Sequence, residues 1–334
     1  MTAPAVSVVL PTYNRAPFLP KAIGAVQAQS FSDWELVIVD DGSTDGTSEI
    51  VAEFARNDGR LRFLTNTRSQ GPAGARNAGI LAARGRLVAF VDSDDLWEPP
   101  KLAAFIDAMS SDRQLVLVGS DYRIAGTDDP TMTMKKFILG TMLPWWMSYP
   151  PAVAVIPCDA IVRDFGVVAR SDLALSLTIA GFLWIHTSSA MVHRDALLRA
   201  GLFDERLQRT EDIDLWLKLA QLGSFGYIDR VLATYHTEGR DEAAGTRYEG
   251  QHRLRKHTPY REAKFHLELL NRIAKSYPLT PAQANLLRHR RAAYHRACLE
   301  HALRARSIHG IQHIPAVILA PEERRTFLRN LRNL

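Results

Sequence analysis

Cysteine is nearly absent from this chain of 334 residues, which contains only Cys158 and Cys298. Two cysteines so far apart form neither a disulfide framework nor the close pairs of a zinc site, so we expect a reducing compartment. The sequence has no run of 18 or more apolar residues and no charged-then-apolar leader. These absences predict a cytoplasmic protein, and its apolar fraction of 46% is enough for a substantial core.

Two glycine-rich phosphate-binding patterns are also missing. The segment Leu10-Pro-Thr-Tyr-Asn14, which follows the first apolar run, has none of the glycines of Gly-x-Gly-x-x-Gly, where a pyrophosphate approaches the backbone closely. The Gly-Lys-Ser/Thr sequence of P-loop proteins does not occur either. A dinucleotide-dependent oxidoreductase is therefore excluded, and a phosphorylated ligand has to be held by a metal ion and side chains.

Short apolar runs that scarcely alternate are the main pattern that is present, and they are typical of parallel strands covered on both faces. Helix-like stretches lie between them. The runs are 6–10, 36–39, 61–64, 87–91 and 115–118, and the helical stretches are 17–29, 44–56, 72–83 and 99–109. This alternation implies right-handed crossovers and predicts an α/β fold, a Rossmann-like, mostly parallel sheet flanked by helices.

Acidic residues follow the second and fourth of these runs directly. They are Asp40, Asp41, Asp92, Asp94 and Asp95. Because ligands bind beyond the carboxyl ends of the strands in such sheets, we expect these carboxylates to share one crevice with the segment 11–13. Carboxylates so close together repel one another unless a cation lies among them. The sequence therefore predicts a Mg²⁺ or Mn²⁺ site, whose ion completes its shell with waters and the phosphates of a ligand.

Five motifs in this order resemble those of family 2 glycosyltransferases, which have the GT-A fold. They are VSVVLPTYNR at 6–15, VDDGS at 39–43, GPAGARNAG at 71–79, DSD at 92–94 and TEDIDLW at 210–216. The resemblance covers about residues 5–238. It implies a GT-A domain over 1–240, with a nucleotide-sugar half at about 1–120 and an acceptor half at about 121–240.

The resemblance also implies roles for residues of the nucleotide-sugar half. Pro11 and Tyr13 would border the nucleobase, with Tyr13 stacked on it, and Asp41 would accept a hydrogen bond from the base, typically from the imide of uracil. Arg76 would pair with the diphosphate. In the Asp-x-Asp motif, Asp92 would lie near the ribose or the metal, and Asp94 would bind the metal. The implied donor is a nucleoside-diphosphate sugar, with UDP the expected nucleotide.

In the acceptor half, Asp212 matches the general base of the family, which removes the proton of the acceptor hydroxyl as the anomeric carbon is attacked with inversion. Residues 184–190 would wall the acceptor. His236 has two interpretations, a contact with diphosphate or metal and an ordinary core or surface histidine. The Gln-x-x-Arg-Trp element of processive synthases is missing, since 215–221 follows the base instead. The resemblance thus implies non-processive transfer of a hexosyl or related sugar to a saccharide or lipid-linked acceptor in polysaccharide or glycan assembly.

Two other classes of function remain as alternatives. Asp92-Ser-Asp-Asp-Leu96 also resembles the nucleophile motif of haloacid-dehalogenase-like phosphatases, although Leu96 stands where those enzymes usually have Thr or Val. A basic nucleic-acid-binding protein is suggested by the pI of about 9.3. Aromatic residues interleaved with the basic ones are few and no binding motif is present, so we expect no nucleic acid as a partner.

The basic charge is concentrated at the end of the chain. Residues 245–334 contain 18 Lys or Arg and 6 Asp or Glu, and the rest of the chain contains 23 and 30. Thr280-Pro-Ala-Gln283 has the pattern of a capping box, which predicts a helix from this point. We therefore expect a basic helical extension over 245–334. It either contacts an anionic membrane or a partner, which would make the protein peripheral at the inner face of the membrane, or packs on the catalytic domain.

Overall fold

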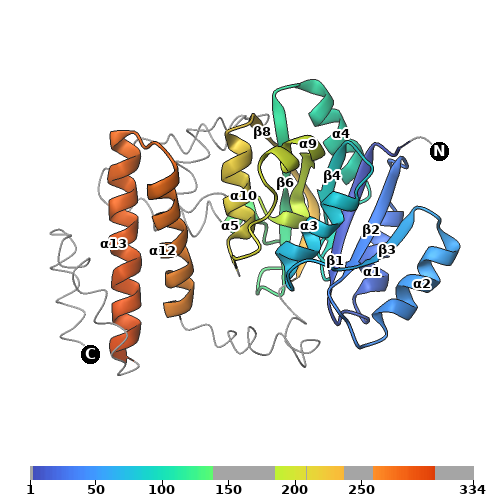
Figure 1. Cartoon of the computed structure of the whole chain (residues 1–334), viewed down its shortest axis with the longest axis horizontal. Helices are drawn as coiled ribbons and strands as arrows, with labels where there is room; N and C mark the ends of the chain where they lie inside the picture. The colour runs from blue at the N-terminus through green and yellow to red at the C-terminus, as the bar shows by residue number, and fades with distance from the viewer. Residues whose placement is uncertain (1–2, 138–184, 208, 237–258, 305–334) are drawn as a thin grey trace. The chain divides into compact units, whose positions relative to one another are not determined.

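The computed structural model describes residues 3–137, 185–207, 209–236 and 259–304. By their contacts, the described residues up to 236 belong to one compact unit and those of 259–304 to a second (Figure 1). None of the helices within these ranges combines the length and the hydropathy needed to cross a membrane.

The first unit is built on one sheet with the strand order β3-β2-β1-β4-β7-β6-β8-β5. Strands β1 to β4 run parallel, β7 is antiparallel to both β4 and β6, β8 is parallel to β6, and β5 is antiparallel to β8. The strands are β1 (Val6–Thr12), β2 (Trp34–Asp40), β3 (Leu61–Thr65), β4 (Leu87–Phe90), β5 (Leu96–Trp97), β6 (Leu115–Ala125), β7 (Ala190–His193) and β8 (Ser224–His236).

Helices cover both faces of this sheet because its strands are apolar on both sides. On one face Val6, Val8 and Leu10 of β1 pack with side chains of α1, α2 and α4. On the other face Val9 packs with α3, α9 and α10. The helices are α1 (Leu19–Gln27), α2 (Thr47–Asn57), α3 (Pro72–Ala82), α4 (Lys101–Ser111), α5 (Met134–Phe137), α9 (Arg194–Arg199) and α10 (Glu211–Ala220), with a 3-10 turn η3 (Thr187–Ser189).

The predicted α/β class with a mostly parallel sheet is confirmed, and each of the five apolar runs forms a strand, although Val91 lies just beyond the end of β4. The difference is at the centre of the sheet. The fourth and fifth runs, in β4 and β6, are not neighbours, because β7 lies between them and pairs with both in the antiparallel sense. A short strand that arrives about a hundred residues after β4 supplies this connection, so no local pattern near β4 could have indicated it.

The register of the strands brings the two acidic segments to the same edge. Thr12 at the end of β1 lies opposite Asp40 of β2, and Val9 lies opposite Phe90, the last residue of β4. Asp41 and Asp92 therefore leave the sheet on either side of β1. This is the arrangement predicted from the acidic residues that follow the apolar runs.

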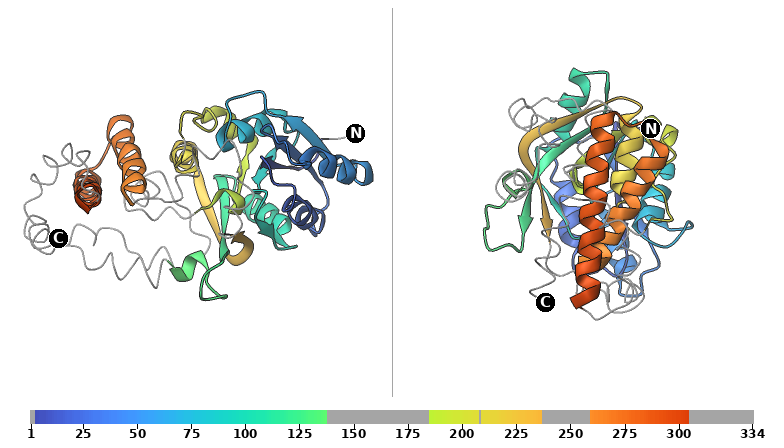
Figure 2. Two further views of the ribbon diagram at one scale, coloured as in Figure 1. Left: turned by 90° about the horizontal axis from the view of Figure 1, so that it is seen from below. Right: turned by 90° about the vertical axis from the view of Figure 1, so that its left-hand side faces the viewer.

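The second unit contains α12 (Pro259–Ser276) and α13 (Pro281–Arg304), which lie side by side (Figure 2). Ala263 and Leu267 of α12 pack with Tyr294 and Cys298 of α13. The predicted capping box is present, because Thr280 N–H donates to Gln283 Oε1 at 2.9 Å and Gln283 N–H donates to Thr280 Oγ at 3.3 Å. The C-terminal helical extension expected from the sequence is thus confirmed over 259–304, and the remainder of the expected range 245–334 lies outside the described residues.

Candidate active site

A buried serine joins the turn after β4 to the 3-10 turn before β7. Ser188 Oγ accepts a hydrogen bond from Asp92 N–H at 2.9 Å and donates one to Asp95 Oδ2 at 2.6 Å. Asp95 Oδ1 accepts from the backbone N–H of His236 at 3.1 Å. Asp95 is fully buried, and it thereby links the turn after β4 to the end of β8. This turn is rigidly held, which fixes the directions of the carboxylates that it carries.

Three side chains at this point form a group that could hold a metal ion. One ligand atom each of Asp92, Asp95 and His186 lie within 4.8 Å of one another. His186 Nδ1 is 3.8 Å from Asp95 Oδ2. Two carboxylates and an imidazole fit a divalent cation, because carboxylate oxygens suit Mg²⁺ and Mn²⁺ and imidazole binds transition ions. Asp94, the metal ligand predicted from the Asp-x-Asp motif, instead lies 3.8 Å from Arg15 Nη2.

Arg76, near the start of α3, is a buried cation shared by two acidic segments. Its Nη2 donates to Asp92 Oδ1 at 2.8 Å and its Nη1 donates to Glu211 Oε1 at 3.0 Å. Burial alone would lower the pKa of the Arg76 guanidinium, but the charges of Asp92 and Glu211 outweigh it and raise the pKa above the usual arginine value. Arg76 therefore stays charged and connects the turn after β4 to the start of α10. Its contact with a diphosphate stays a prediction.

Asp212, the predicted general base, lies in the first turn of α10, after Thr210, which has a left-handed backbone with φ of 61°. Its Oδ1 accepts from Ile213 N–H at 2.8 Å. Removal from water and the charge of the neighbouring Glu211 raise the pKa of Asp212 to about 7, against the hydrogen bond from Ile213 and the charge of Arg76. A carboxyl with such a pKa is half ionised near neutral pH, which is the range in which a general base works best.

Aromatic rings lie between the carboxylates of the two halves. The His186 ring is 4.6 Å from the Tyr235 ring and 5.6 Å from the Tyr122 ring, centre to centre. Burial, followed by the neighbouring Tyr235 and Asp212, raises the pKa of Tyr122 well above its usual value. Tyr122 is thus close enough to Asp212 to interact with its charge. Tyr122 therefore interacts with carboxylates of both segments, Asp95 of the turn after β4 and Asp212 at the start of α10.

The expected nucleobase pocket lies at the ends of β1 and β2. Asp41 is 8% exposed, and its two carboxylate oxygens accept from Asn66 Nδ2 at 2.5 Å and from Gly71 N–H at 2.8 Å. Asn14, with φ of 50°, holds the turn after β2 through Ser43 Oγ and Thr44 N–H, both at 2.8 Å. These contacts hold Asn14, the residue after Tyr13, against the turn after β2. Pro11 and Tyr13 are both half-buried. The roles of Pro11, Tyr13 and Asp41 toward a base stay predictions.

The predicted site residues fall into three neighbouring groups. Arg76 joins Asp92 to Glu211, the residue before Asp212. Asp41 contacts the loop before α3, and Asp94 faces Arg15. Sequence reasoning did not identify His186 as a candidate ligand or Ser188 as the connecting residue. The sequence pointed to these two residues only through their position in the segment 184–190, which was expected to line the acceptor site. The signal for Asp95 was present, since it belongs to the acidic group after the fourth run.

Lys101, the first residue of α4, has a fully buried amine. Its Nζ has no hydrogen-bond partner among the residues that the structure describes, and it lies 4.3 Å from the centre of the Phe105 ring and 5.2 Å from that of Trp97. Burial lowers the pKa of Lys101 well below its usual value, although the charge of Asp95 opposes this. Burial of the charge therefore outweighs the attraction, and Lys101 reduces the stability of the fold at neutral pH.

Replacing Lys101 by Met is expected to increase the free energy of unfolding at pH 7 by ~1 kcal/mol or more, because an apolar chain of similar length avoids the cost of burying the charge. Urea unfolding of the two proteins measures this difference in the free energy of unfolding. The gain should vanish above pH 10.5, the ordinary lysine pKa, since the amine is then neutral in both the folded and the unfolded chain. Lys101→Ala is the control and should be less stable than Lys101→Met, because it leaves a cavity. A Met variant less stable than wild type would show that Asp95 compensates the charge fully.

The mostly parallel sheet covered by helices, with carboxylates gathered where its strands end, defines a GT-A type of α/β protein. The chain belongs to glycosyl transferase family 2. The model of that family, described as "Glycosyl transferase family 2", matches residues 7–164. The resemblance seen in the five motifs is therefore confirmed, and it takes the place of the phosphatase interpretation of Asp92-Ser-Asp-Asp-Leu96.

Curated relatives agree with this assignment. The putative teichuronic acid biosynthesis glycosyltransferase TuaG of Bacillus subtilis is 33% identical in an alignment of 192 residues that covers 54% of this chain and 74% of that protein. The Escherichia coli β-1,3-glucosyltransferase WfgD, named for UDP-Glc and α-D-GlcNAc-diphosphoundecaprenol, is 42% identical over 104 residues, 31% of this chain and 40% of that protein. Several further relatives are matched over less than half of their own length.

Solved structures show the same fold. The mannosyltransferase PcManGT of Pyrobaculum calidifontis, in complex with GDP-Man and Mn²⁺, superposes with a TM-score of 0.58 at 21% identity, covering 98% of this chain and 81% of that one. S. aureus TarS 1-349 in complex with UDP has a TM-score of 0.53 at 17% identity, covering 100% of this chain and 92% of that one. At these identities the likeness establishes the GT-A fold.

Proposed function

We propose that the protein transfers one sugar from a nucleoside-diphosphate sugar to an acceptor hydroxyl, with inversion at the anomeric carbon and with Mn²⁺ or Mg²⁺ as cofactor. The observation that carries this proposal is the connection of Asp212 and Glu211 through Arg76 to Asp92. The buried guanidinium of Arg76 thus links the segment that carries Asp212, whose pKa is near 7, to Asp92, a candidate metal ligand. Inverting sugar transfer needs both a base and a charge-stabilising site.

In the reaction, the acceptor hydroxyl loses its proton to Asp212 while its oxygen forms a bond to the anomeric carbon. The bond from that carbon to the diphosphate oxygen breaks, and its electron pair leaves with the nucleoside diphosphate. A divalent cation at the site supplies Lewis-acid stabilisation of this leaving group. Arg76 orients Asp92 and Glu211, and burial together with the charge of Glu211 keeps the proton affinity of Asp212 high.

Two sets of residues are candidates for holding the cation, and both contain Asp92. The motif supports Asp92 with Asp94, and the geometry supports Asp92 with Asp95 and His186. His236, whose backbone is held by Asp95 and whose Nδ1 is buried, is within the same part of the unit. We propose Asp94 as a ligand that reaches the ion once its contact with Arg15 opens, since that contact is as long as 3.8 Å.

For the donor, we propose a UDP-sugar whose uracil contacts Pro11, Tyr13 and Asp41. The name of WfgD, with UDP-Glc as its donor and a lipid diphosphate as its acceptor, supports this choice and a lipid-linked or saccharide acceptor. TarS complexes with UDP and UDP-GlcNAc lend further support. The name of TuaG supports a role in polysaccharide assembly. We place this activity in the cytoplasm.

The proposal is tested by thermal unfolding with nucleotides and metal. UDP at about 100 times its Kd with Mn²⁺ is expected to stabilise the fold by ~2.7 kcal/mol, because it binds the native state alone. This corresponds to a rise in Tm of about 5–10 °C. With EDTA the rise should disappear, and GDP and CDP should give smaller shifts. Stabilisation by UDP that is equal in EDTA would contradict metal dependence, and an equal response to GDP would contradict the uridine donor.

A further inference from the structure

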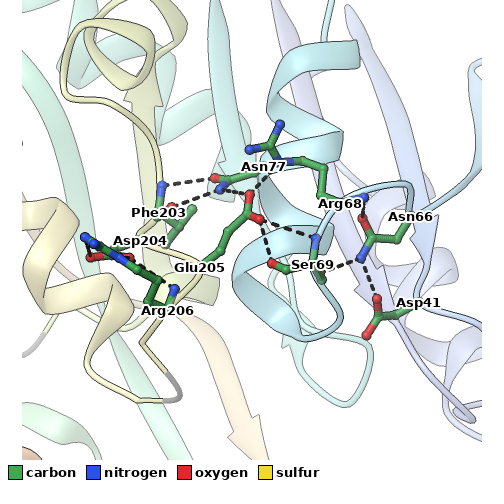
Figure 3. A network of polar contacts seen from close by, with 9 residues as sticks. All are labelled: Asp41, Asn66, Arg68, Ser69, Asn77, Phe203, Asp204, Glu205 and Arg206. Atoms are coloured by element: carbon green, nitrogen blue, oxygen red, sulfur yellow. Dashed lines mark hydrogen bonds and ion pairs between the residues drawn. The ribbon is translucent and has the colours of Figure 1, made fainter.

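A polar network connects the expected nucleobase pocket to the segment that leads into α10 (Figure 3). It contains Asp41 at one end, the loop 66–71 between β3 and α3 in the middle, and Glu205 at the other end. Because 66–71 and 202–206 are far apart in the sequence, this contact is made only in the folded unit. It joins the half of the domain that we assign to the nucleotide-sugar donor to the half that we assign to the acceptor.

The loop is attached to Asp41 through Asn66. The Nδ2 of Asn66 donates both to Asp41 Oδ1, at 2.5 Å, and to the carbonyl oxygen of Ser69, at 3.0 Å. Gly71, which ends the loop with φ of 125°, donates its N–H to the second oxygen of Asp41 at 2.8 Å. With one donor on each oxygen, the loop sets the direction in which the Asp41 carboxylate points.

Glu205 holds the opposite side of the same loop. Its Oε2 accepts from Ser69 Oγ at 2.5 Å and from Ser69 N–H at 3.3 Å, and its Oε1 accepts from Arg68 Nε and, at 2.8 Å, from Asn77 Nδ2. Burial alone would raise the pKa of Glu205, but the hydrogen bonds from Asn77, Ser69 and Arg68 outweigh it and lower the pKa to about 2. Glu205 is therefore an ionised acceptor with four donors.

The attachment of Glu205 to α3 is itself rigid. Asn77 is 1% exposed, and it exchanges two hydrogen bonds with the backbone of Phe203, at 2.9 Å and 3.0 Å. On the loop side, a Cβ at Gly74 would lie 1.9 Å from the Ser69 carbonyl oxygen, so the loop packs directly on the backbone of α3. A loop held this closely on both sides transmits a displacement of Ser69 to Asn66 and Asp41.

We propose that Glu205 is a positioning residue for the base of the donor. By holding Arg68 and Ser69 it fixes the loop 66–71, and through Asn66 and Gly71 the loop fixes the Asp41 carboxylate that receives the base. This inference rests on the proposed function, because it assigns Asp41 to a uridine donor. It adds that recognition of the base depends on a residue of the acceptor half, only a few positions before Asp212.

Isothermal titration with Mn²⁺ and two probes, UDP and inorganic pyrophosphate, tests the proposal. The variants are Glu205→Gln, which keeps the shape and removes the charge, and Ser69→Ala, which removes one hydroxyl. Glu53→Gln, the same change at an exposed position of α2, is the matched control. Both test variants are expected to bind UDP about tenfold more weakly, equivalent to ~1.4 kcal/mol, and pyrophosphate within twofold of wild type. The double variant should be no weaker than Glu205→Gln, since both changes act on one contact.

The two probes separate positioning from general damage to the fold. UDP affinity within twofold of wild type in both variants would overturn the proposal, and so would an equal loss of UDP and pyrophosphate binding. If Glu205→Gln fails to fold, the UDP-to-pyrophosphate ratio of Ser69→Ala decides. A wild-type protein that binds pyrophosphate but not UDP would instead overturn the uridine donor and, with it, this inference. Failure of the inference alone therefore differs visibly from failure of the proposed function.

Discussion

Replacement of Asp212 by Asn is expected to reduce the rate of sugar transfer by about 10²–10⁴-fold, the usual contribution of a general base. The amide keeps the size of the carboxyl and its hydrogen bond from Ile213 N–H, but it cannot take up the proton of the acceptor hydroxyl. Binding of UDP with Mn²⁺ should remain within about twofold of wild type, because no hydrogen bond among the described residues joins the Asp212 side chain to Pro11, Tyr13 or Asp41. Release of UDP, measured with and without acceptor, reports the change.

The control for this variant lies on the same helix. Asp214→Asn makes the same chemical change two residues further on, where the carboxylate pairs with Lys218 at 2.6 Å. It should keep nearly all of its transfer activity, since its charge is used within the helix. Full transfer by Asp212→Asn, or equal losses in the two variants, would contradict the assignment of the base.

The pH dependence of the wild-type protein follows from the same group. Since the pKa of Asp212 is raised to about 7, the fraction of the ionised base and the rate of transfer should rise through pH 7 and level off above pH 8. The folded state binds this proton more tightly than the unfolded chain, so stability falls as pH rises from about 4 to 7. Asp212→Asn removes the penalty, and its Tm should exceed that of wild type at pH 8 but not at pH 4.

Replacement of Arg76 by Met is expected to cause the largest loss of stability among single changes at the site, about 3–5 kcal/mol. It leaves the carboxylates of Asp92 and Glu211 without the buried cation that pairs with both at 3.0 Å or less. The corresponding fall in Tm is about 6–20 °C. The protein should also lose transfer activity, because the directions of Asp92 and Glu211 are no longer fixed.

Thermal and urea unfolding measure this effect, with Arg56→Met as the matched control. Arg56 is exposed on α2, so its replacement should change the free energy of unfolding by no more than about 0.5 kcal/mol. Arg76→Lys should fall between the two, since an ammonium keeps the charge but cannot form both contacts in the same fork. A stable Arg76→Met protein would show that the two carboxylates take up protons without cost to the fold.

Much of the fold could be predicted because its strands are buried on both faces and therefore form uninterrupted apolar runs. The runs at 6–10, 36–39 and 87–91 lie within or across the ends of β1, β2 and β4, and the acidic residues after them meet at one edge. The antiparallel strand β7 and the short strand β5 could not be predicted. Their partners lie far away in the sequence, and strands of four and two residues carry too little periodicity to be recognised.

The kinds of side chain at the site could be predicted, but which of them contact one another could be predicted only in part. A run such as Asp92-Ser-Asp94-Asp95 indicates a carboxylate cluster, yet spacing does not tell which side chain of a turn points inward. In the structure Asp95 N–H donates to the carbonyl oxygen of Asp92 at 3.0 Å, which folds the turn back and buries Asp95. His186 comes from a turn before a distant strand, so only the folded chain brings it to Asp92.

The place of β7 between β4 and β6 also bears on how the chain is made. Val88 of β4 pairs with Val192, so one side of β4 has no partner until about a hundred further residues have been synthesised. At ordinary rates of translation this interval is about 5–20 s. During it the nascent protein presents an open, apolar strand edge, the kind of surface that pairs with other chains. Chaperone capture at the ribosome, and aggregation of fragments that stop before residue 190, are the expected results.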